Sequence, residues 1–575
     1  MDVIGELLHG FQLAFTPQLL IAAFVGAFAG TLVGVLPGIG PVAGAALLLP
    51  LTFSYSPAVG LILVAGIFLG GQYGGSTTSV LLNIPGEGSS IVATFDGYKM
   101  TQRGRGGAAL TIMAIGSWIA GTIGLLLVVG LARPLASFGL QFGPAEYFAL
   151  TAGGLLALAR ISGGRIGDGL LPMIIGIGLS TVGVEAASGV ARYTFGNLGL
   201  SLGFGLPAVA VGLYGISELM LMLEDRTGER RPRHVRLKEL FPTRTEWRRA
   251  WAPWIRGSFI GFIFGLLPVP AATLSTFASY RVEQSVSKYR HEIGKGAVEG
   301  IAGPEAANNS AAIGSLVPVL VLGLPFSATL ALMLSAMIVQ GVQPGPLLMT
   351  QNPDLFWSVI ASMYVANIML LVLNLPLISV WTAVLRTPRY ILVPAIVVIA
   401  MIGSYSINSN ITDVITTVIF GLVGYILRKF KFSLASFLVG LVLGPLIEKY
   451  LRTGLFLSGG DPLYFLSRPI AVVIWILVVA VLLGGAIARI VRRARLRAAG
   501  IDPDSVLASR PTLEELEAAS EDDGPVTVPT QIPPTDSFAA VPIPWRTRRR
   551  SKSAAALRRD EALDRDAERA IDEDE

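Results

Sequence analysis

Long apolar runs with few charged residues recur along the chain, and short polar or basic segments separate them. The clearest runs cover residues 111–132, 203–222, 391–403, 411–427 and 470–488. A helix of about 20 apolar residues spans the hydrocarbon core of a bilayer. The pattern therefore predicts an all-α polytopic membrane protein with about 10–12 transmembrane helices.

Two further stretches, residues 30–86 and 257–327, share an unusual interrupted pattern. Each begins with glycines spaced along an apolar helix, breaks near a proline, and continues to a polar cluster. The clusters are GGSTTS at 74–79 and ANNSAA at 307–312, and each precedes an apolar run that ends in Ile-Pro or Leu-Pro. Interrupted apolar segments at matching places in two halves are typical of a secondary transporter and its binding site.

Basic residues gather between the apolar runs and predict the topology, because positively charged loops stay in the cytoplasm. The basic segments are residues 99–105, 160–165, 225–256, 386–389, 428–431 and 491–497. The predicted spans lie near 110–133, 143–159, 168–184, 203–224, 357–384, 388–406, 410–427, 432–448 and 469–491. The segments 41–85 and 258–325 are predicted to be broken or re-entrant.

This topology places the two copies of the interrupted module in opposite orientations. Residues 95–107, after the first module, are basic and are predicted to be cytoplasmic. Residues 339–354, after the second module, carry no basic residue, and the order of crossings places them outside. The sequence therefore predicts two inverted-topology repeats, an architecture that lets a carrier alternate between two faces of the membrane.

The predicted organisation has four parts. They are a first membrane repeat (1–224), a basic cytoplasmic linker (225–252), a second membrane repeat (253–497) and a disordered cytoplasmic tail (498–575). The tail mixes Pro, Ser and charged residues without apolar periodicity, which favours disorder. Alternatively, residues 511–520 could form a short helix that docks a partner.

Composition supports the membrane class and narrows the chemistry. Charged residues make up 14% of the chain and the mean hydropathy is +0.64, whereas ordinary soluble proteins carry about 25% charged residues. Cysteine is absent, and none of the three histidines is spaced from another as zinc ligands usually are. An intramembrane enzyme would need a nucleophile with a base, or a metal, and the apolar runs offer neither. A channel-like subunit or an ATP-driven permease subunit is the alternative to a carrier, although the chain has no GxxxxGK[ST] motif.

A solute site is predicted where the first module breaks, because the second half of a broken helix presents free N–H groups and a positive dipole end. The predicted solute ligands are Gly38, Gly40, Gly74, Gly75, Ser76, Thr77, Thr78, Ser79 and Asn83. Alternatively, the hydroxyls bond to their own helix and the glycines allow tight packing. Packing is the favoured role of Gly30 and Gly34.

A cation site is predicted in the second module. Glu305, Asn308 and Asn309 share one helical face at i, i+3 and i+4, with Ser310 beside them. One carboxylate with amide oxygens suits a monovalent cation, and ionisable groups inside a membrane are functional candidates. The alternative is a polar clamp between helices.

Four other polar residues have weaker predicted roles. Asp413 is a candidate ligand or part of a helix start. Asp96 is expected to stabilise a local turn at the cytoplasmic edge. Glu185 and Arg192 lie on a predicted outside loop, where contact with a binding protein is possible.

Several strings resemble the large permease subunit (TctA) of the tripartite tricarboxylate transporters. They are LVGVLPGIGP, LLNIPGEGSSIVATFDGYKMTQRGRGGAAL, EIGKGAVEGIAGPEAANNSAAIGSLVPVLVLGLP, GVQPGPLLM and VGLVLGPLIE. The resemblance extends over roughly residues 15–490. It implies a permease of the bacterial inner membrane that works with a small membrane subunit (TctB) and a periplasmic solute-binding protein (TctC). It also implies carboxylate uptake driven by a cation gradient, with sodium, or else a proton, as the coupling ion and no other cofactor.

The chain departs from this family pattern at three positions. Val269 stands in the second broken helix where the family usually repeats PGxG, and Phe326 stands where a glycine is usual. Glu185 stands where the family generally carries aspartate. The first two changes are expected to stiffen loops in which glycine would allow close backbone approach.

Overall fold

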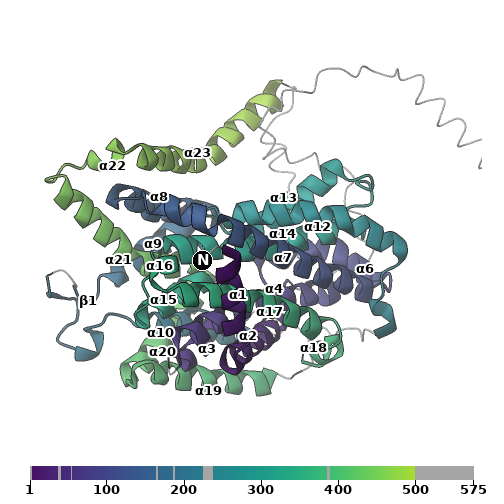
Figure 1. Cartoon of the computed structure of the whole chain (residues 1–575), viewed down its shortest axis with the longest axis horizontal. Helices are drawn as coiled ribbons and strands as arrows, with labels where there is room; N and C mark the ends of the chain where they lie inside the picture. The colour runs from purple at the N-terminus through teal and green to yellow at the C-terminus, as the bar shows by residue number, and fades with distance from the viewer. Residues whose placement is uncertain are drawn as a thin grey trace, which may run out of the picture. The chain divides into compact units, whose positions relative to one another are not determined.

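The computed structural model is almost entirely helical, which confirms the predicted fold class (Figure 1). It describes residues 3–36, 40–53, 55–83, 85–162, 166–185, 188–224, 237–384, 387 and 389–498. Eight of the helices in the described residues are long and apolar enough to cross a membrane, and five further apolar helices are shorter. Residues 1–483 form one compact unit and 484–575 a second. The tail from residue 499 lies outside the described residues.

The first half contains the following elements. They are α1 (Val3–Ala14), α2 (Pro17–Val35), α3 (Gly40–Thr52), α4 (Pro57–Leu82), η1 (Gly88–Ser90), α5 (Ile91–Ala93), η2 (Thr94–Tyr98), α6 (Lys99–Gln102), α7 (Gly106–Gly139), α8 (Pro144–Ser162), α9 (Ile166–Ser180), β1 (Gly183–Val184), β2 (Ala191–Arg192), η3 (Leu198–Leu200), α10 (Leu206–Ala210), η4 (Val211–Ile216) and α11 (Ser217–Glu224). The two short strands pair antiparallel.

The second half is also helical in the described residues. Its elements are η5 (Leu237–Leu240), α12 (Arg244–Gly265), α13 (Ala271–Val286), α14 (Glu299–Gly314), η6 (Pro318–Leu322), α15 (Ala328–Val339), α16 (Leu348–Gln351), α17 (Pro353–Asn374), α18 (Ile378–Val384), α19 (Arg389–Asn408), α20 (Ile411–Lys429), α21 (Leu434–Leu457), α22 (Tyr464–Ser467) and α23 (Pro469–Ala498). Helix α12 begins within the segment that was predicted to be the linker.

Two glycine seams hold together the first long helices of each half. Helix α2 packs along α4, and α12 packs along α14. A Cβ atom at Gly30 would lie 2.5 Å from the backbone oxygen of Ile67, and one at Gly261 would lie 2.2 Å from that of Ala307. Side chains larger than hydrogen therefore do not fit in either seam, which is how small residues let membrane helices approach closely. The predicted packing role of Gly30 and Gly34 is confirmed.

The two halves contact each other in a reciprocal way. Helix α7 of the first half packs on α12 and α14, while α17 of the second half packs on α2 and α4. Similarly, α9 packs on α21 while η4 packs on α20. A two-fold relation between the halves would produce such an exchange, and this relation stays a prediction. The orientation of each half relative to a membrane stays a prediction.

The contacts in the glycine seams show which positions of the two halves correspond, and they change the predicted equivalence of the two polar clusters. Gly34 contacts Gly71 in the first seam, and Gly265 contacts Ala311 in the second, so Gly71 corresponds to Ala311. The GGSTTS cluster begins three residues after Gly71, whereas ANNSAA begins four residues before Ala311. The two polar clusters are therefore not equivalent positions, because the helix packing sets the register and their similar composition does not.

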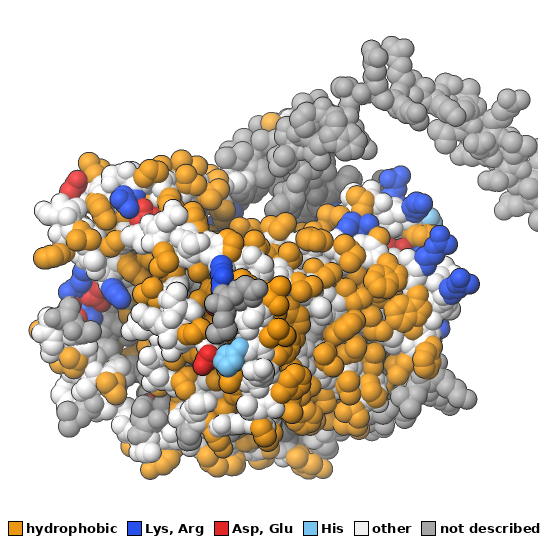
Figure 2. Space-filling view, in the orientation of Figure 1, with side chains coloured by type: hydrophobic (Ala, Val, Ile, Leu, Met, Phe, Trp, Pro, Cys, Tyr) orange, Lys and Arg blue, Asp and Glu red, His pale blue; other side chains and the backbone are white. Residues whose placement is uncertain are grey.

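Much of the outer surface is apolar, as expected for a protein embedded in lipid. Many large hydrophobic side chains are more than a third exposed, including those of α17, α19 and α20. Hydrophobic side chains dominate the face in Figure 2, and many of the Lys and Arg side chains on this face gather at one edge.

Candidate functional site

A pocket of about 270 Å³ lies between the two halves of the membrane unit. Each half lines it with the first residues of the helix that follows an interruption between two helices. These residues are Pro41 and Val42 of α3, and Ala271–Thr273 of α13. The first turn of α15 also contributes, through Ala328 and Thr329. The interrupted segments thus meet at one pocket.

The helix breaks have local causes. A non-helical Leu36 ends α2, and α3 then restarts at Gly40, whose φ of +67° favours glycine. In the second half Pro268 and Pro270 separate α12 from α13, since proline cannot continue the preceding helix. Ser327 caps α15 by accepting a hydrogen bond from Leu330 N at 3.3 Å.

The electrostatics of the pocket favour an anion. The first turn of a helix has backbone N–H groups without an intrahelical partner, and the helix dipole adds partial positive charge there. Three helices of 12 to 16 residues, α3, α13 and α15, direct these ends at the pocket. The polar lining also includes Gln72 and Ser315, and Glu87 contributes the single charged side chain of the lining in the described residues.

The predicted solute ligands lie mostly away from this pocket. Gly38 lies outside the described residues, and Gly40 begins α3 next to the lining residue Pro41. Asn83 is exposed and ends α4 in the left-handed conformation, with φ of 59°. The structure therefore brings one of these three, Gly40, to the edge of the pocket.

Helix α4 continues through Gly74 and Gly75, so these two predicted ligands do not lie at a helix break. A Cβ atom at Gly74 would lie 2.4 Å from Thr31 O, and one at Gly86 would lie 2.6 Å from the Cα of Gly75. Close packing explains Gly74 and Gly86, whereas a Cβ atom at Gly75 would meet only ordinary contacts, the nearest at 3.6 Å. A role for Gly74 and Gly75 in solute binding stays a prediction.

The four hydroxyls that follow all lie within hydrogen-bond distance of a carbonyl of their own helix, and for Thr77, Thr78 and Ser79 this is the contact observed. Thr78 and Ser79 donate to Gly75 O at 2.9 and 3.0 Å, and Thr77 lies 3.5 Å from Tyr73 O. This geometry matches the alternative interpretation of the cluster. Contact of these three hydroxyls with solute also stays a prediction.

Ser76 lies 3.2 Å from Gln72 O of its own helix and also joins the two halves through Glu305. Its hydroxyl lies 2.9 and 2.8 Å from the two carboxylate oxygens of Glu305, which is buried. Ser117 of α7 donates to the same carboxylate at 3.3 Å, and Asn309 Nδ2 donates to Ser117 Oγ at 2.7 Å. We call Ser76, Ser117, Glu305 and Asn309 the Glu305 cluster.

A cavity of about 20 Å³ adjoins the Glu305 cluster. Its lining includes Tyr73, Thr77 and Asn374 besides Ser76, Ser117 and Glu305. The side-chain oxygen of Asn374 has no hydrogen-bond partner in the described structure, although the residue is only 6% exposed. A space of this size holds a single water molecule or ion, so the cavity presents several oxygen atoms to one small species.

The other two predicted cation ligands point elsewhere. Ser310 donates to Ser258 O at 2.6 Å and thereby ties α14 to α12. Asn308 is fully buried, and neither atom of its amide has a partner among the described residues. Of the predicted set, the structure therefore brings Glu305 and Asn309 together, and a cation at these residues stays a prediction.

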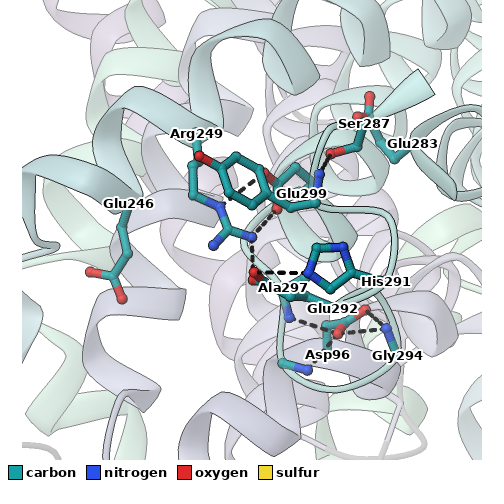
Figure 3. Close-up of polar contacts among 12 residues, drawn as sticks. Asp96, Glu246, Arg249, Glu283, Ser287, His291, Glu292, Gly294, Ala297 and Glu299 are labelled. Carbon is teal, nitrogen blue, oxygen red and sulfur yellow. Dashed lines mark hydrogen bonds and ion pairs between the residues drawn. The ribbon is translucent and has the colours of Figure 1, made fainter. Parts of the chain in front are cut away.

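Asp96 forms a second contact between the halves, at the edge that is predicted to be cytoplasmic (Figure 3). Its buried carboxylate accepts hydrogen bonds from Gly294 N at 2.9 Å, Gly296 N at 2.6 Å and Ala297 N at 2.8 Å. Tyr280 also donates to it, at 3.0 Å. Burial, and then the nearby Asp96 carboxylate, raise the pKa of Tyr280 above its usual value. The expected local turn is wrong, because the partners of Asp96 lie about two hundred residues away in sequence.

The remaining predicted residues have structural partners. Asn410 caps α20 by accepting a hydrogen bond from Thr412 N at 2.9 Å, which places Asp413 in the first turn and confirms the predicted helix start. Arg192 pairs with Glu448 at 2.8 Å, and Glu185 pairs with an arginine of α21. Contact of Glu185 and Arg192 with a binding protein stays a prediction.

Several residues that line the pocket or the small cavity were not predicted as ligands from the sequence. Val269 and Phe326, noted only as departures from a family pattern, both line the pocket. Glu87 follows the Pro-Gly turn after α4, inside one of the quoted strings. Ser117 and Asn374 are isolated polar residues in apolar helices, a signal that marks functional positions in membranes.

Comparison with known proteins identifies relatives over most of the membrane part. The model of the tripartite tricarboxylate transporter TctA family matches residues 20–439. An uncharacterized 52.8 kDa protein in the TAR-I ttuC' 3'region of Agrobacterium vitis is 45% identical over 82% of this chain and 94% of its own length. An uncharacterized protein in the TAR-II ttuC' 3'region of the same organism is 47% identical over 37% of this chain and 87% of its own length. No solved structure matches the chain.

Proposed function

Because the chain belongs to the tripartite tricarboxylate transporter TctA family, we propose that it is the large membrane subunit of a secondary carrier that takes up a small carboxylate. Its proposed partners are a small TctB-like membrane subunit and a TctC-like solute-binding protein outside the cytoplasm. The proposed location is the bacterial cytoplasmic membrane, with the C-terminal tail in the cytoplasm.

The convergence of three helix N-termini on one pocket is the observation that carries this proposal. Backbone N–H groups at helix N-termini bind carboxylate and phosphate groups without a basic side chain. The side chains of Gln72, Thr273 and Thr329 add hydrogen-bonding groups on several sides. A di- or tricarboxylate, with carboxylates pointing in different directions, fits this arrangement.

The charge of the pocket supports coupling to a cation. Its described lining contains no Lys or Arg, and Glu87 adds a negative charge. The buried Glu305 carboxylate lies in the same unit, next to a cavity that polar and apolar side chains line together. A polyanion entering such a region is favoured when cations enter with it, since unpaired buried charge is costly. We propose that sodium, or else a proton, binds at the Glu305 cluster during uptake.

Uptake of a ¹⁴C-labelled tricarboxylate tests the function directly. Cells that produce this chain, the small subunit and the binding protein should accumulate the label, and omission of any one of the three should abolish accumulation. Collapse of the sodium gradient should stop uptake, whereas ATP depletion with the gradient maintained should not. Full uptake without the binding protein would contradict the tripartite proposal, and dependence on ATP alone would favour a pump.

Replacement of Glu305 tests the cation site. Glu305→Gln keeps the size and one oxygen of the side chain but removes the charge that offsets dehydration of the cation. We expect the sodium concentration for half-maximal uptake to rise by about tenfold or more, because a charged partner is lost. If Glu305→Gln transports with an unaltered sodium dependence, the cation binds elsewhere and the Glu305 cluster is a packing clamp.

A further inference from the structure

A large groove on the surface of the second half has a marked positive charge. It has a volume of about 1060 Å³ and lies along the N-terminal part of α12, beside the end of α13 and the loop that follows. Five basic side chains line it: Arg244, Arg248, Arg249, Arg256 and Lys288. Figure 2 shows Lys and Arg side chains gathered at the edge of the molecule where these elements lie in Figure 1.

Two of these basic side chains are neutralised by buried acids. Arg249 forms a two-pronged pair with Glu299, at 2.9 and 2.7 Å (Figure 3). It also stacks on the ring of Tyr289. Arg256 forms a similar pair with Glu283, at 2.9 and 2.6 Å. The carboxylates of Glu299 and Glu283 are therefore engaged by Arg249 and Arg256 and do not pair with the other basic side chains of the groove.

The other three basic side chains remain available for a ligand. Arg244 and Arg248 are exposed on successive turns of α12, and Lys288 lies opposite them on the loop after α13. None of the three has an ion pair or hydrogen bond with another described residue. The nearest glutamate of the same helix, Glu246, pairs with Arg105 instead. Among the described residues, no acid neutralises these three positive charges.

An apolar stripe continues from the groove along the outer face of α12. Trp251, Ile255, Phe259 and Ile263 follow one another at four-residue spacing and are between 39% and 59% exposed. The opposite face of α12 is the glycine seam against α14. The stripe therefore faces away from the protein interior, and Trp251 stands where the stripe meets the groove.

We propose that the groove binds the headgroup of an anionic phospholipid of the cytoplasmic leaflet, whose acyl chains lie along this stripe. Arginine side chains bind phosphate through paired N–H donors, and basic pockets on the cytoplasmic side of membrane proteins hold anionic headgroups. Tryptophan is enriched at the membrane interface. Phe259 lies 11 residues beyond Arg248 in the sequence, a distance of roughly 16 Å along a helix, close to half of the hydrocarbon thickness.

Native mass spectrometry of the purified full-length chain tests this proposal, with phosphatidylglycerol or phosphatidylcholine added to the detergent. We expect preferential retention of phosphatidylglycerol by the unchanged chain. The triple variant Arg244→Gln, Arg248→Gln, Lys288→Gln should retain it at least about tenfold less. The matched control, Arg103→Gln, Arg160→Gln, Lys431→Gln, makes the same change of charge at other predicted cytoplasmic positions and should retain it normally. Equal retention of the two lipids, or equal loss in the two variants, would overturn the proposal.

Quenching of tryptophan fluorescence by brominated acyl chains tests the apolar stripe. Dibrominated phosphatidylglycerol should quench the chain more than dibrominated phosphatidylcholine, and the difference should disappear in Trp251→Phe. Glycerol phosphate, which has the headgroup chemistry without acyl chains, should compete at least about tenfold more weakly. Equal competition by glycerol phosphate would show a soluble-anion site instead. Protection of Trp251 by the small membrane subunit would show a protein interface, and either result would overturn the lipid assignment.

Discussion

Two side chains of α4, one turn apart, illustrate how similar residues can differ in role. Both lie within hydrogen-bond distance of a carbonyl of their own helix, but only Ser76 also contacts the Glu305 carboxylate of the other half, at 2.8 Å. Both are buried and both carry the same hydroxyl group. The difference lies only in what each side chain faces, so the two residues form a matched pair for testing the Glu305 cluster.

We predict that Ser76→Ala raises the sodium concentration for half-maximal uptake by about tenfold, because a hydrogen bond to a charged group contributes roughly 1.5–3 kcal/mol. Ser79→Ala should leave the sodium dependence unchanged. Sodium titration of ¹⁴C-labelled carboxylate uptake, with equal amounts of each variant in the membrane, measures both. Equal effects of the two substitutions would show that Ser76 has no specific role in cation coupling.

Asp96 also acts as a single residue with long-range partners. Asp96→Ala leaves at least three N–H groups of the loop 294–297 without their acceptor. We expect the free energy of unfolding to fall by about 3 kcal/mol, since loss of one partner from a buried charged network is strongly destabilising. Thermal unfolding in detergent measures the change. Glu292→Gln, at a partly exposed acid of the same loop, is the control, and an unshifted melting temperature for Asp96→Ala would contradict the prediction.

At the scale of helices, the glycine seams set how closely each pair can approach. Gly257, Gly261 and Gly265 contact α14 at four-residue spacing, as Gly26, Gly30 and Gly34 contact α4. The seams bring α4 and α14 into fixed positions. These two helices carry Ser76 and Glu305, so each seam positions one side of the Glu305 cluster within its own half.

A methyl group in a seam should therefore be costly. In Gly261→Ala the new Cβ atom would lie 2.2 Å from Ala307 O, and backbone on both sides leaves little room to adjust. We expect destabilisation of about 1–3 kcal/mol or more, as for overpacked cores. Gly130→Ala in α7, where a Cβ atom meets nothing within 4 Å, should be neutral. Thermal unfolding of the two variants distinguishes them, and similar melting temperatures would refute the seam argument.

At the scale of the whole molecule, the reciprocal packing of the two halves supports alternation between two faces of the membrane. The pocket and the Glu305 cluster both take residues from each half. A relative movement of the halves would therefore change both sites together. Such coupling of solute and cation sites is what a symporter requires, provided that the halves are inverted in the membrane.

Labelling of single cysteines tests the inverted orientation, because the natural chain has no cysteine. Gln102 and Gln351 are both exposed, and each follows the interrupted module of its half. We predict that Gln102→Cys reacts with a membrane-impermeant maleimide only from the cytoplasm and Gln351→Cys only from outside. Reaction of both from the same side would remove the inverted-repeat proposal.

The sequence by itself determined the class of the protein and much of its local structure. Apolar runs located the helices that became α7, α17, α19, α20 and α21, because a helix long enough to span a bilayer leaves its signal in consecutive residues. Glycine spacing identified the packing role of Gly30 and Gly34, and prolines marked the break between α12 and α13. All of these are short-range signals.

Only the tertiary structure decided which polar groups meet. It made α4 continuous through Gly74 and Gly75, and it joined Ser76 to Glu305 across 229 residues. It also joined Asp96 to the loop at Gly296 across 200 residues. It gathered the N-termini of α3, α13 and α15 around one pocket. Such contacts depend on which helix faces pack together. The packing depends on the surface shape of whole helices, and a local sequence pattern does not contain that information.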